Sequence, residues 1–324
     1  MSSLKRIKEP IKDEIREFEK FFKNSMRSKV PLLDIITNYI IRRKGKQIRP
    51  VFVFLSAKLH GGITQSTYNA ATIVELMHTA TLVHDDVVDE SYQRRGFFSI
   101  NALWKNKISV LVGDYLLSKG LLLAVENEEF GVLKIVSDAV KEMAEGELLQ
   151  LEKARKLNID EEIYFEIIRK KTAALLAACT AAGAKSANAS EETVEKMRMF
   201  GENIGIAFQI KDDLFDYQED NQTGKPSGND IQEKKMTLPL IYTYNHSNNS
   251  KKREIKKTIS KHNKDSKKVH KVIEYVNGNG GIQYAEQKMI EYRDKSLQIL
   301  HEFTDSKAKT ALIELVKFTI DRKK

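Results

Sequence analysis

Three aspartates stand close together within Thr81–Glu90, namely Asp85, Asp86 and Asp89. The segment around them has helical signals and contains neither Gly nor Pro. Residues four apart on a helix are neighbours at about 5–6 Å, so Asp85 and Asp89 should project side by side, with Asp86 beside them. Carboxylates this close repel one another unless a cation lies between them, and their hard oxygens suit Mg²⁺.

An exposed acidic helix face is the simpler interpretation of one such triplet, since charged helix faces usually point to solvent. Two features count against it. The residues before the triplet are apolar or small, so the carboxylates end a stripe that should be buried. The same spacing returns in Asp212, Asp213 and Asp216, again after an apolar helical run. We therefore expect two helices that face each other across a cavity, each supplying metal ligands.

The elements that must position these aspartates are predicted to be helices throughout. The 324 residues include five prolines, and none lies between Pro50 and Pro226, an interval rich in helix formers. Strand-like alternation bounded by turn signals is absent from the sequence. We expect a single all-α domain over residues 1–324, with its motifs at 45–242 and peripheral C-terminal helices at 247–322.

The formal net charge is +9, and much of the excess lies in the Lys-rich stretch Lys251–Lys271. An excess of positive charge can bind nucleic acid, a membrane surface or anionic small substrates. The stretch is most simply a solvated face, and no aromatic residues interleave with its lysines, so we expect no nucleic-acid partner. A peripheral membrane contact for product release stays open.

The cellular context is predicted from absences in the sequence. Cys179 is the only cysteine, which fits a reducing cytoplasm. The first residues lead into a charged segment without the apolar region of a signal peptide. We expect no membrane span, because the longest apolar candidate, residues 173–184, falls short of the roughly 20 residues required. The protein is therefore expected in the cytoplasm.

At its two acidic motifs the chain resembles a family, the trans-isoprenyl diphosphate synthases or polyprenyl synthetases, and the resemblance covers roughly residues 45–242. It implies an isoprenoid synthase fold, a bundle of about 10–14 helices around a central cavity. It also implies a homodimer and three Mg²⁺ ions per active site with substrate bound. All six aspartates of the two motifs would be metal ligands, and the first two of each motif and Asp89 would be catalytic.

A basic motif precedes the first aspartates, with Lys46 and Arg49 in Gly45-Lys-Gln-Ile-Arg-Pro50. A Lys and an Arg three apart at a helix beginning can cradle an anion, helped by free backbone N–H groups. The pair matches the Gly-Lys-x-x-Arg-Pro motif of the family, which implies binding of the isopentenyl diphosphate. His78 is more often a core residue by its pattern, but the resemblance implies the same binding role. His84 is assigned a structural role.

Two arginines, Arg94 and Arg95, follow the first acidic motif, and guanidinium groups suit bidentate phosphate contacts. The resemblance implies that Arg94 contacts the allylic diphosphate and Arg95 the isopentenyl diphosphate. It also implies that Lys225 and Lys235 close over the allylic diphosphate. Lys234 stands where the family usually has Gly, so the choice between Lys234 and Lys235 stays open.

Further matches lie on predicted helices between the two acidic motifs. Gly146 and Gln150 resemble a Gly-Glu-x-x-Gln signature. Lys171 and Thr172 match a Lys-Thr pair at which, in the family, the helix distorts and offers oxygen atoms to the developing cation. Gln209, three residues before Asp212, matches a position near the reacting carbons. The resemblance makes Lys171, Thr172 and Gln209 both catalytic and substrate-binding.

The predicted reaction condenses an allylic diphosphate, with farnesyl diphosphate as the expected primer, with successive isopentenyl diphosphates. In the family, bulky side chains just before the first motif block the growing product. Here Ala80 and Thr81 are small, and Met77 lies a turn deeper, so we expect a product of C35–C40 for a quinone side chain. A shorter-chain farnesyl or geranylgeranyl synthase is the alternative.

Three other classes were weighed. A class I terpene cyclase shares the first acidic motif but usually has an Asn/Ser/Glu pattern at its second metal site. An HD-type helical phosphohydrolase could use His84 and Asp85, yet it leaves the second triplet and the two arginines unexplained. A non-catalytic partner subunit of a two-chain synthase would be expected to lack these aspartates.

Overall fold

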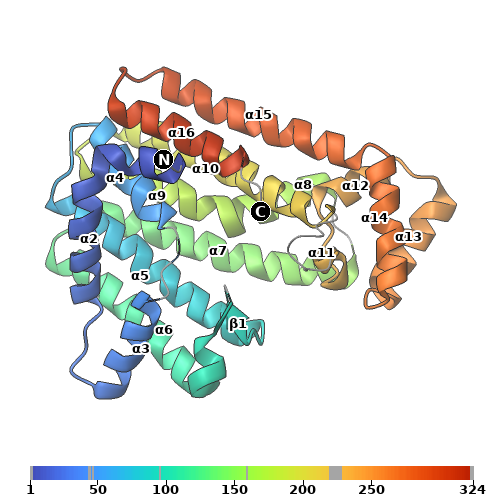
Figure 1. Ribbon diagram of the computed structural model, residues 1–324, viewed down its shortest axis with the longest axis horizontal. Coiled ribbons are helices and arrows are strands. Elements are labelled where there is room, and N and C mark those ends of the chain that lie inside the picture. The colour runs from blue at the N-terminus through green and yellow to red at the C-terminus, as the bar shows by residue number, and fades with distance from the viewer. Residues whose placement is uncertain are drawn as a thin grey trace. The chain divides into compact units, whose positions relative to one another are not determined.

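The computed structural model describes residues 3–42, 45, 47–94, 96–157, 160–218 and 228–321. Over this part of the chain it contains sixteen α-helices, a 3₁₀ turn, a π turn and one two-stranded hairpin (Figure 1). In chain order the elements are α1 Ser3–Lys8, η1 Glu9–Ile11, α2 Lys12–Ser25, α3 Pro31–Arg42, α4 Ile48–Leu59, α5 Gln65–Val88, β1 Gln93–Arg94, β2 Phe97–Phe98, α6 Ile100–Glu126, α7 Phe130–Lys156, α8 Glu161–Ile168, η2 Arg169–Ala173, α9 Ala174–Ser186, α10 Glu191–Phe215, α11 Asn229–Gln232, α12 Leu238–Asn245, α13 Asn249–Lys261, α14 Ser266–Gly278, α15 Gly281–His301 and α16 Lys307–Asp321. The prediction of an all-α chain is confirmed.

The hairpin of β1 and β2 is the one element type that the sequence did not predict. Its two strands pair antiparallel, with Arg94 opposite Phe97. Gly96 lies between them at φ 76°, a backbone conformation that glycine adopts without a steric penalty. The segment after the first acidic motif therefore returns on itself.

Two compact units make up the fold. Unit 1 comprises Met1–Lys141, Leu175–Gly201 and Ile299–Leu315, and unit 2 comprises Glu142–Ala174, Glu202–Gln298 and Val316–Lys324. Several long helices, α7, α9, α10, α15 and α16, contribute residues to both units. The expectation of one domain over the whole chain stays a prediction.

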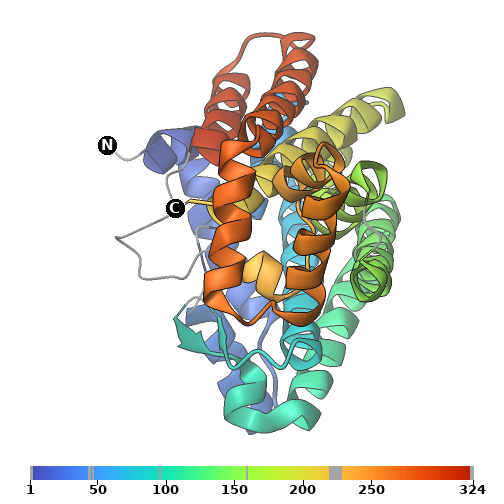
Figure 2. The ribbon, with the colours of Figure 1, turned by 90° about the vertical axis from the view of Figure 1, so that its right-hand side faces the viewer.

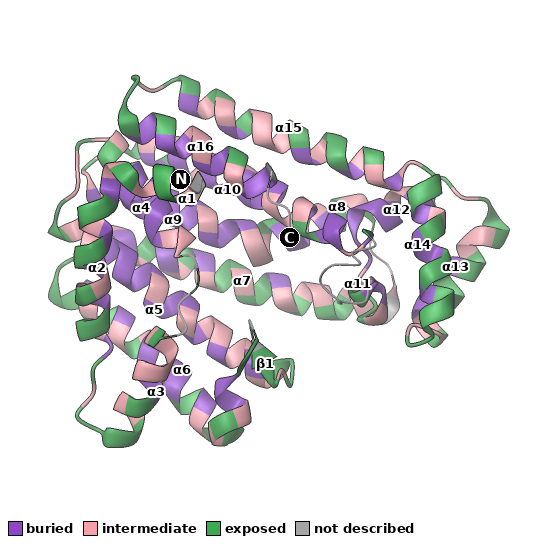
Figure 3. Cartoon of the chain, viewed as in Figure 1, coloured by how far each residue is buried: buried purple, intermediate pink, exposed green. Residues whose placement is uncertain are grey.

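The core of unit 1 is built on α5, which packs along α6 and against α4. Residues Pro50–Ala57 of α4 are all buried, so this helix is covered on every face (Figure 3). A helix that is apolar all round needs such cover, because no polar stripe is left to face water. The helix that carries the first acidic motif is thus held from two sides.

One helix, α6, is long and apolar enough to cross a membrane when it is judged by length and composition alone. Its most apolar window has a mean hydropathy of 1.7 and is 33% buried. Asp114 and Lys119 interrupt the apolar stretch of this helix, and the expectation of no membrane span stays a prediction. The backbone of α6 leaves the helical conformation once, at Lys105 (φ 68°, ψ 164°).

Unit 2 holds the second acidic motif at the end of α10, together with η2 and the helices near the C-terminus. The helices α13 and α14 lie side by side in it (Figure 2). They bury one apolar face and expose most lysines of the Lys-rich stretch, whereas Lys251 and Lys252 are partly buried.

Candidate functional site

The first acidic motif lies at the C-terminal end of α5. Asp85 is partly exposed, Asp86 is buried and Asp89 is the exposed C-cap residue. The N–H of Asp89 donates to the Asp85 carbonyl at 2.8 Å, and the N–H of Ser91 donates to the Asp86 carbonyl at 3.0 Å. Asn101 of α6 also donates to the Asp86 carbonyl, at 3.0 Å. Backbone hydrogen bonds therefore fix the helix end that carries the three aspartates.

The second motif also stands at the C-terminal end of its helix, α10. Ser190 caps the start of this helix by accepting the N–H of Thr193 at 3.2 Å. The last carbonyls of a helix carry partial negative charge, so carboxylates are disfavoured there, by about 0.3–1 kcal/mol each. Both acidic motifs thus stand where only a bound cation would favour them.

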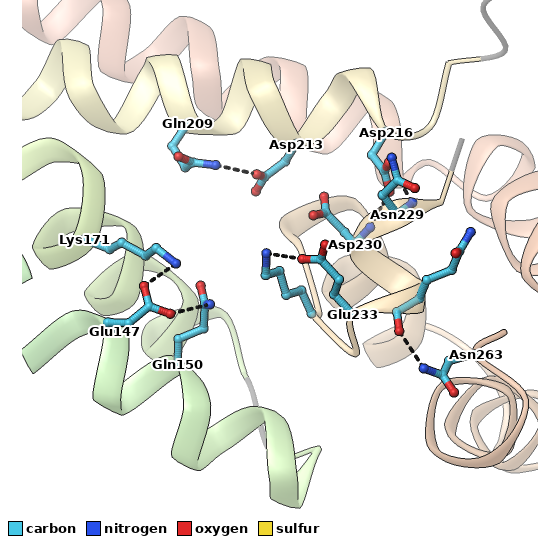
Figure 4. Close-up of polar contacts among 12 residues, drawn as sticks. Glu147, Gln150, Lys171, Gln209, Asp213, Asp216, Asn229, Asp230, Glu233 and Asn263 are labelled. Atoms are coloured by element: carbon cyan, nitrogen blue, oxygen red, sulfur yellow. Dashed lines mark hydrogen bonds and ion pairs between the residues drawn. The ribbon is translucent and has the colours of Figure 1, made fainter. Parts of the chain in front are cut away.

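The three carboxylates of the second motif differ in their surroundings. Asp212 is exposed, whereas Asp213 is only 6% exposed. The Asp213 carboxylate accepts a hydrogen bond from the Tyr164 hydroxyl at 2.7 Å. It accepts another from the Gln209 amide at 2.8 Å (Figure 4). Both of its oxygens are therefore already bonded within unit 2, while Asp212 is the more accessible carboxylate.

Burial changes the acidity of two carboxyl groups at this site. Burial, together with the charge of Asp230, raises the pKa of Asp213 to about 8. Burial, together with the charge of Asp216, raises the pKa of Asp230 to about 7. Both shifts have the same physical origin, since negative charge is gathered here out of water without enough positive charge to balance it.

The Lys-Thr pair lies in η2, a π turn between α8 and α9. The N–H of Ala174 donates to the Arg169 carbonyl, five residues back, which is the spacing of a π turn. The distortion that the family resemblance implied at Lys171 and Thr172 is present. It turns the Thr172 hydroxyl toward α10, where it donates to the Gln209 side-chain oxygen at 2.8 Å.

Two glycines let neighbouring helices approach the π turn. A Cβ atom on Gly146 of α7 would lie 2.8 Å from both the Lys170 Cβ and the Lys171 nitrogen. A Cβ atom on Gly205 of α10 would lie 2.6 Å from the Ala173 Cα. Neither space admits a side chain, so Gly146 serves close packing.

Two lysines of unit 2 are paired with carboxylates. Lys171 forms an ion pair with Glu147, which also accepts a hydrogen bond from Gln150 at 3.4 Å (Figure 4). Lys235 forms an ion pair with Glu233. Burial lowers the pKa of Lys235, but the pairing with Glu233 outweighs it and the pKa is raised. Lys235 is therefore held as a cation.

The structure distinguishes the two adjacent lysines. Lys234 is exposed and adopts φ 61°, the left-handed conformation that explains why glycine is usual at this position in the family. Lys235 is partly buried and lies close enough to Asp230 and Glu147 for their charges to raise its pKa. The geometry favours Lys235 as the residue that meets a diphosphate.

In unit 1, Arg49 lies in the first turn of α4, and His78 is buried in α5. Within the described residues, the Arg49 Nε is buried and its N–H donates to no hydrogen-bond partner. A guanidinium in this state at a helix beginning is suited to an anion. His84 instead packs on α6, where its Nε2 lies 3.2 Å from the Val110 carbonyl, in keeping with a structural role.

Lys46, Arg95 and Lys225 lie outside the described residues, as does the side chain of Arg94. The first and second acidic motifs belong to different units, so their predicted confrontation across a cavity stays a prediction.

The residues expected to set product length lie on α5 in unit 1. Ala80 is fully buried and Thr81 is partly exposed. Met77 is 4% exposed and lies against α6, where a Cβ atom on Gly120 would come 3.4 Å from its Cγ. Met77 and Ala80 therefore belong to the packed interior of unit 1.

Over the described ranges, no cluster of three or more His, Cys, Asp or Glu side chains is arranged to hold a metal ion by itself. Mg²⁺ commonly binds through one or two carboxylates, with substrate phosphates and water completing its coordination. The accessible Asp212, at a helix end that disfavours negative charge, fits such a shared site.

Three residues of this region were not predicted from the sequence: Tyr164, Asp230 and Glu233. Asp230 stands two residues after Gly228 at the end of a polar loop, and that position was its one sequence signal. Tyr164 lies within an apolar helical pattern and carries no sequence signal of its bond to Asp213.

Comparison with known proteins agrees with these features. A polyprenyl synthetase family model matches residues 30–276. The chain is 35% identical over 315 residues to the all-trans-nonaprenyl-diphosphate synthase (geranyl-diphosphate specific) of Rhodobacter capsulatus, covering 97% of this chain and 96% of that protein. It is also 35% identical over 298 residues to the octaprenyl diphosphate synthase of Escherichia coli K12, covering 92% of each.

Solved structures show the same fold. A decaprenyl diphosphate synthase from Rhodobacter capsulatus superposes with a TM-score of 0.92 at 33% identity, covering 98% of each chain. A polyprenyl synthase from Caulobacter crescentus, complexed with calcium and isoprenyl diphosphate, superposes with a TM-score of 0.89 at 33% identity, covering 98% of each chain. A geranylgeranyl pyrophosphate synthase from Bacteroides thetaiotaomicron superposes with a TM-score of 0.85 at 39% identity, covering 99% of this chain and 100% of that one. The chain therefore belongs to the polyprenyl synthetase family of prenyltransferases.

Proposed function

We propose that this prenyltransferase is a Mg²⁺-dependent long-chain synthase that extends farnesyl diphosphate with successive isopentenyl diphosphates. The product is an all-trans polyprenyl diphosphate of C35–C40 for a quinone side chain. One observation carries the proposal. In unit 2 the π turn of Lys171 and Thr172 is hydrogen-bonded through Gln209 to Asp213 of the second acidic motif. This arrangement brings together the Lys171 cation, the Thr172 and Gln209 oxygen atoms and the carboxylates of the motif.

The residues present fit a divalent metal held jointly with a diphosphate. Asp85, Asp86 and Asp89 at one helix end and Asp212 at the other are the side chains that would hold the ions, three in all with substrate present. Bound Mg²⁺ supplies positive charge that stabilises a departing diphosphate. Lys171 and Lys235 are the described cations that would contact the same phosphates after leaving Glu147 and Glu233.

In the reaction, the bond between C1 of the allylic substrate and its diphosphate oxygen breaks, and pyrophosphate leaves with the electron pair. The double bond of isopentenyl diphosphate attacks C1, and a proton then passes to the pyrophosphate. The Thr172 hydroxyl donates a hydrogen bond to the Gln209 side-chain oxygen, so the lone pairs of the hydroxyl oxygen can stabilise the developing cation. Water must be excluded, because it would trap that cation.

The long product is supported by the small side chains at Ala80 and Thr81 and by likeness to octaprenyl and nonaprenyl synthases. A shorter-chain synthase is the second candidate, favoured by the 39% identity to a geranylgeranyl pyrophosphate synthase. Incubation with Mg²⁺, farnesyl diphosphate and labelled isopentenyl diphosphate, followed by sizing of the lipid, decides between them. C35–C40 supports the long-chain assignment, and C20 supports the alternative.

The same incubation separates the remaining classes. Cyclisation without incorporation of label would indicate a terpene cyclase, phosphate release alone a phosphohydrolase, and an inert chain a partner subunit. We expect labelled polyprenyl product, reduced by orders of magnitude in Asp85→Ala and in Asp212→Ala while both variants remain folded. Near-normal turnover in both variants would contradict the assigned metal-binding role.

A homodimer is part of the proposal, supported by the face of α6 in unit 1. Large apolar side chains of this helix are 42–55% exposed, namely Leu103, Val110, Leu111, Leu121, Leu122 and Val125. A second copy of the chain would cover such a face. Light scattering of the wild-type protein should give twice the mass of one chain. The double variant Leu111→Glu, Leu122→Glu should give the mass of a single chain. Ile290→Glu, an exposed position on α15, is the control that should leave the dimer intact.

We also propose a cytoplasmic enzyme that touches anionic membrane surfaces through α13 and α14. The exposed basic residues of this face are Arg253, Lys256, Lys257, Lys261, Lys264, Lys267, Lys268 and Lys271. Near an anionic bilayer each of these residues contributes about 1 kcal/mol to the binding free energy, and salt weakens this attraction by screening the charges. Sedimentation with anionic vesicles should occur at low salt and vanish at high salt. Equal binding to neutral vesicles would contradict this.

A further inference from the structure

Asp216, the last carboxylate of the second acidic motif, is engaged by the backbone of its own chain. One carboxylate oxygen accepts the N–H of Asn229 at 2.9 Å, and the other accepts the N–H of Asp230 at 3.0 Å (Figure 4). The Asp216 carbonyl also accepts the N–H of Gly228 at 3.0 Å. Three consecutive backbone N–H groups are thus bonded to one residue.

These bonds fasten the start of the short helix α11. Gly228 precedes it at φ 88°, and a Cβ atom there would lie 2.5 Å from a methyl group of Val269. The turn is therefore confined on one side by α14 and on the other by the Asp216 carboxylate. The first N–H groups of a helix need external acceptors, and Asp216 supplies them.

The segment that Asp216 fastens leads directly to Lys235. The N–H of Lys235 donates to the Asp230 carbonyl at 2.8 Å, so the end of the segment is bonded to its beginning. Glu233 in the same segment holds the Lys235 ammonium. A displacement of Asp230 would therefore displace Lys235 as well.

We propose that Asp216 is a positioning residue, which holds α11 and through it Lys235 at the diphosphate, and that it is not one of the metal ligands. The inference rests on the proposed function for the role of Lys235. It separates the motif into the accessible Asp212, which would face the metal, and Asp216, which faces its own backbone. The family resemblance by itself assigns both to metal.

The first test needs neither metal nor substrate. Amide hydrogen exchange of the metal-free protein should accelerate at residues 228–235 by tenfold or more in Asp216→Ala. Asp216→Asn keeps one acceptor oxygen and should give an intermediate rate. Asp212→Asn is the matched control on the same helix end and should leave the exchange of this segment unchanged. Exchange in Asp216→Ala that equals the wild-type rate would overturn the proposal.

The second test separates positioning from metal binding by titration with inorganic pyrophosphate and with Mg²⁺. Asp216→Ala should weaken pyrophosphate binding at saturating Mg²⁺ by about tenfold. Its half-saturating Mg²⁺ concentration should stay within about twofold of wild type, whereas Asp212→Asn should raise this value. An equal rise in both variants would make Asp216 a metal ligand and overturn the proposal.

Failure of the proposed function has a different signature. A wild-type enzyme that forms no polyprenyl product would contradict the proposed function. The exchange experiment would still decide whether Asp216 holds the segment, because it requires no reaction.

Discussion

The Thr172 hydroxyl donates a hydrogen bond of 2.8 Å to the Gln209 side-chain oxygen and so joins the π turn η2 to α10. Gln209 passes the connection on by donating to Asp213, which also binds Tyr164. Three helical segments, α8, η2 and α10, are held together by this chain of polar groups. The orientation of each member therefore depends on the next.

Removal of the Thr172 hydroxyl tests that connection. Thr172→Val keeps the shape of the side chain, removes one hydrogen bond of about 1 kcal/mol and should lower kcat about tenfold. A double-mutant cycle with Gln209→Ala measures the coupling. If the two effects on kcat simply add, the hydrogen bond does not serve catalysis.

Close packing at Gly146 gives a second prediction. Gly146→Ala inserts a methyl group 2.8 Å from the Lys171 nitrogen and should destabilise the fold by about 1–3 kcal/mol, with a loss of kcat as Lys171 shifts. Chemical denaturation measures the first effect. Gly278→Ala is the matched control in α14, because nothing lies within 4 Å of the added methyl. A Gly146→Ala protein as stable as this control would contradict the packing argument.

The backbone at Lys234 gives a third prediction. A non-glycine residue at φ 61° costs about 1–2 kcal/mol, while glycine loses about 0.5–1 kcal/mol more entropy on folding. Lys234→Gly should therefore raise the free energy of unfolding by about 0.5–1 kcal/mol. Lys234→Ala removes the same charge but keeps the Cβ, so it should bring no gain. A gain shared by both variants would point to charge instead of backbone strain.

Product length gives a fourth prediction. Ala80 is fully buried, so Ala80→Phe adds a large ring at the position that is expected to border the growing chain. The labelled product should become shorter by several isoprene units. Ala80→Val is the mild control and should shorten it less. An unchanged length in a folded Ala80→Phe protein would place the tunnel elsewhere.

Stability should depend on pH through His60. Burial lowers the pKa of His60 from 6.5 to about 4, and its ring lies edge-on against Phe303 in unit 1. A lowered pKa favours the neutral ring in the folded state. The stabilisation is therefore complete above pH 6.5 and is lost as the pH falls toward 4.

Denaturant unfolding at pH 7 and pH 5 measures this effect. Between pH 7 and pH 5 the free energy of unfolding of the wild-type protein should fall by about 1 kcal/mol more than that of His60→Phe, after allowance for solvent screening. Equal losses in the two proteins would show that other groups carry the pH dependence.

Much of the outline followed from local sequence. Long proline-free runs of helix formers predicted the all-α chain, and Ser190, which caps α10, is a residue type typical of helix starts. These features depend on neighbours within a few residues, so propensity and capping suffice to predict them.

The roles within each acidic motif were decided by tertiary structure. Asp212, Asp213 and Asp216 are the same residue type at a helix end, and the sequence by itself determined their spacing and the need for a cation. Only the folded chain brings Tyr164 to Asp213 and the backbone of α11 to Asp216, leaving Asp212 accessible. The physical reason is that spacing along one helix specifies which way a side chain points, whereas its partners come from segments distant in sequence.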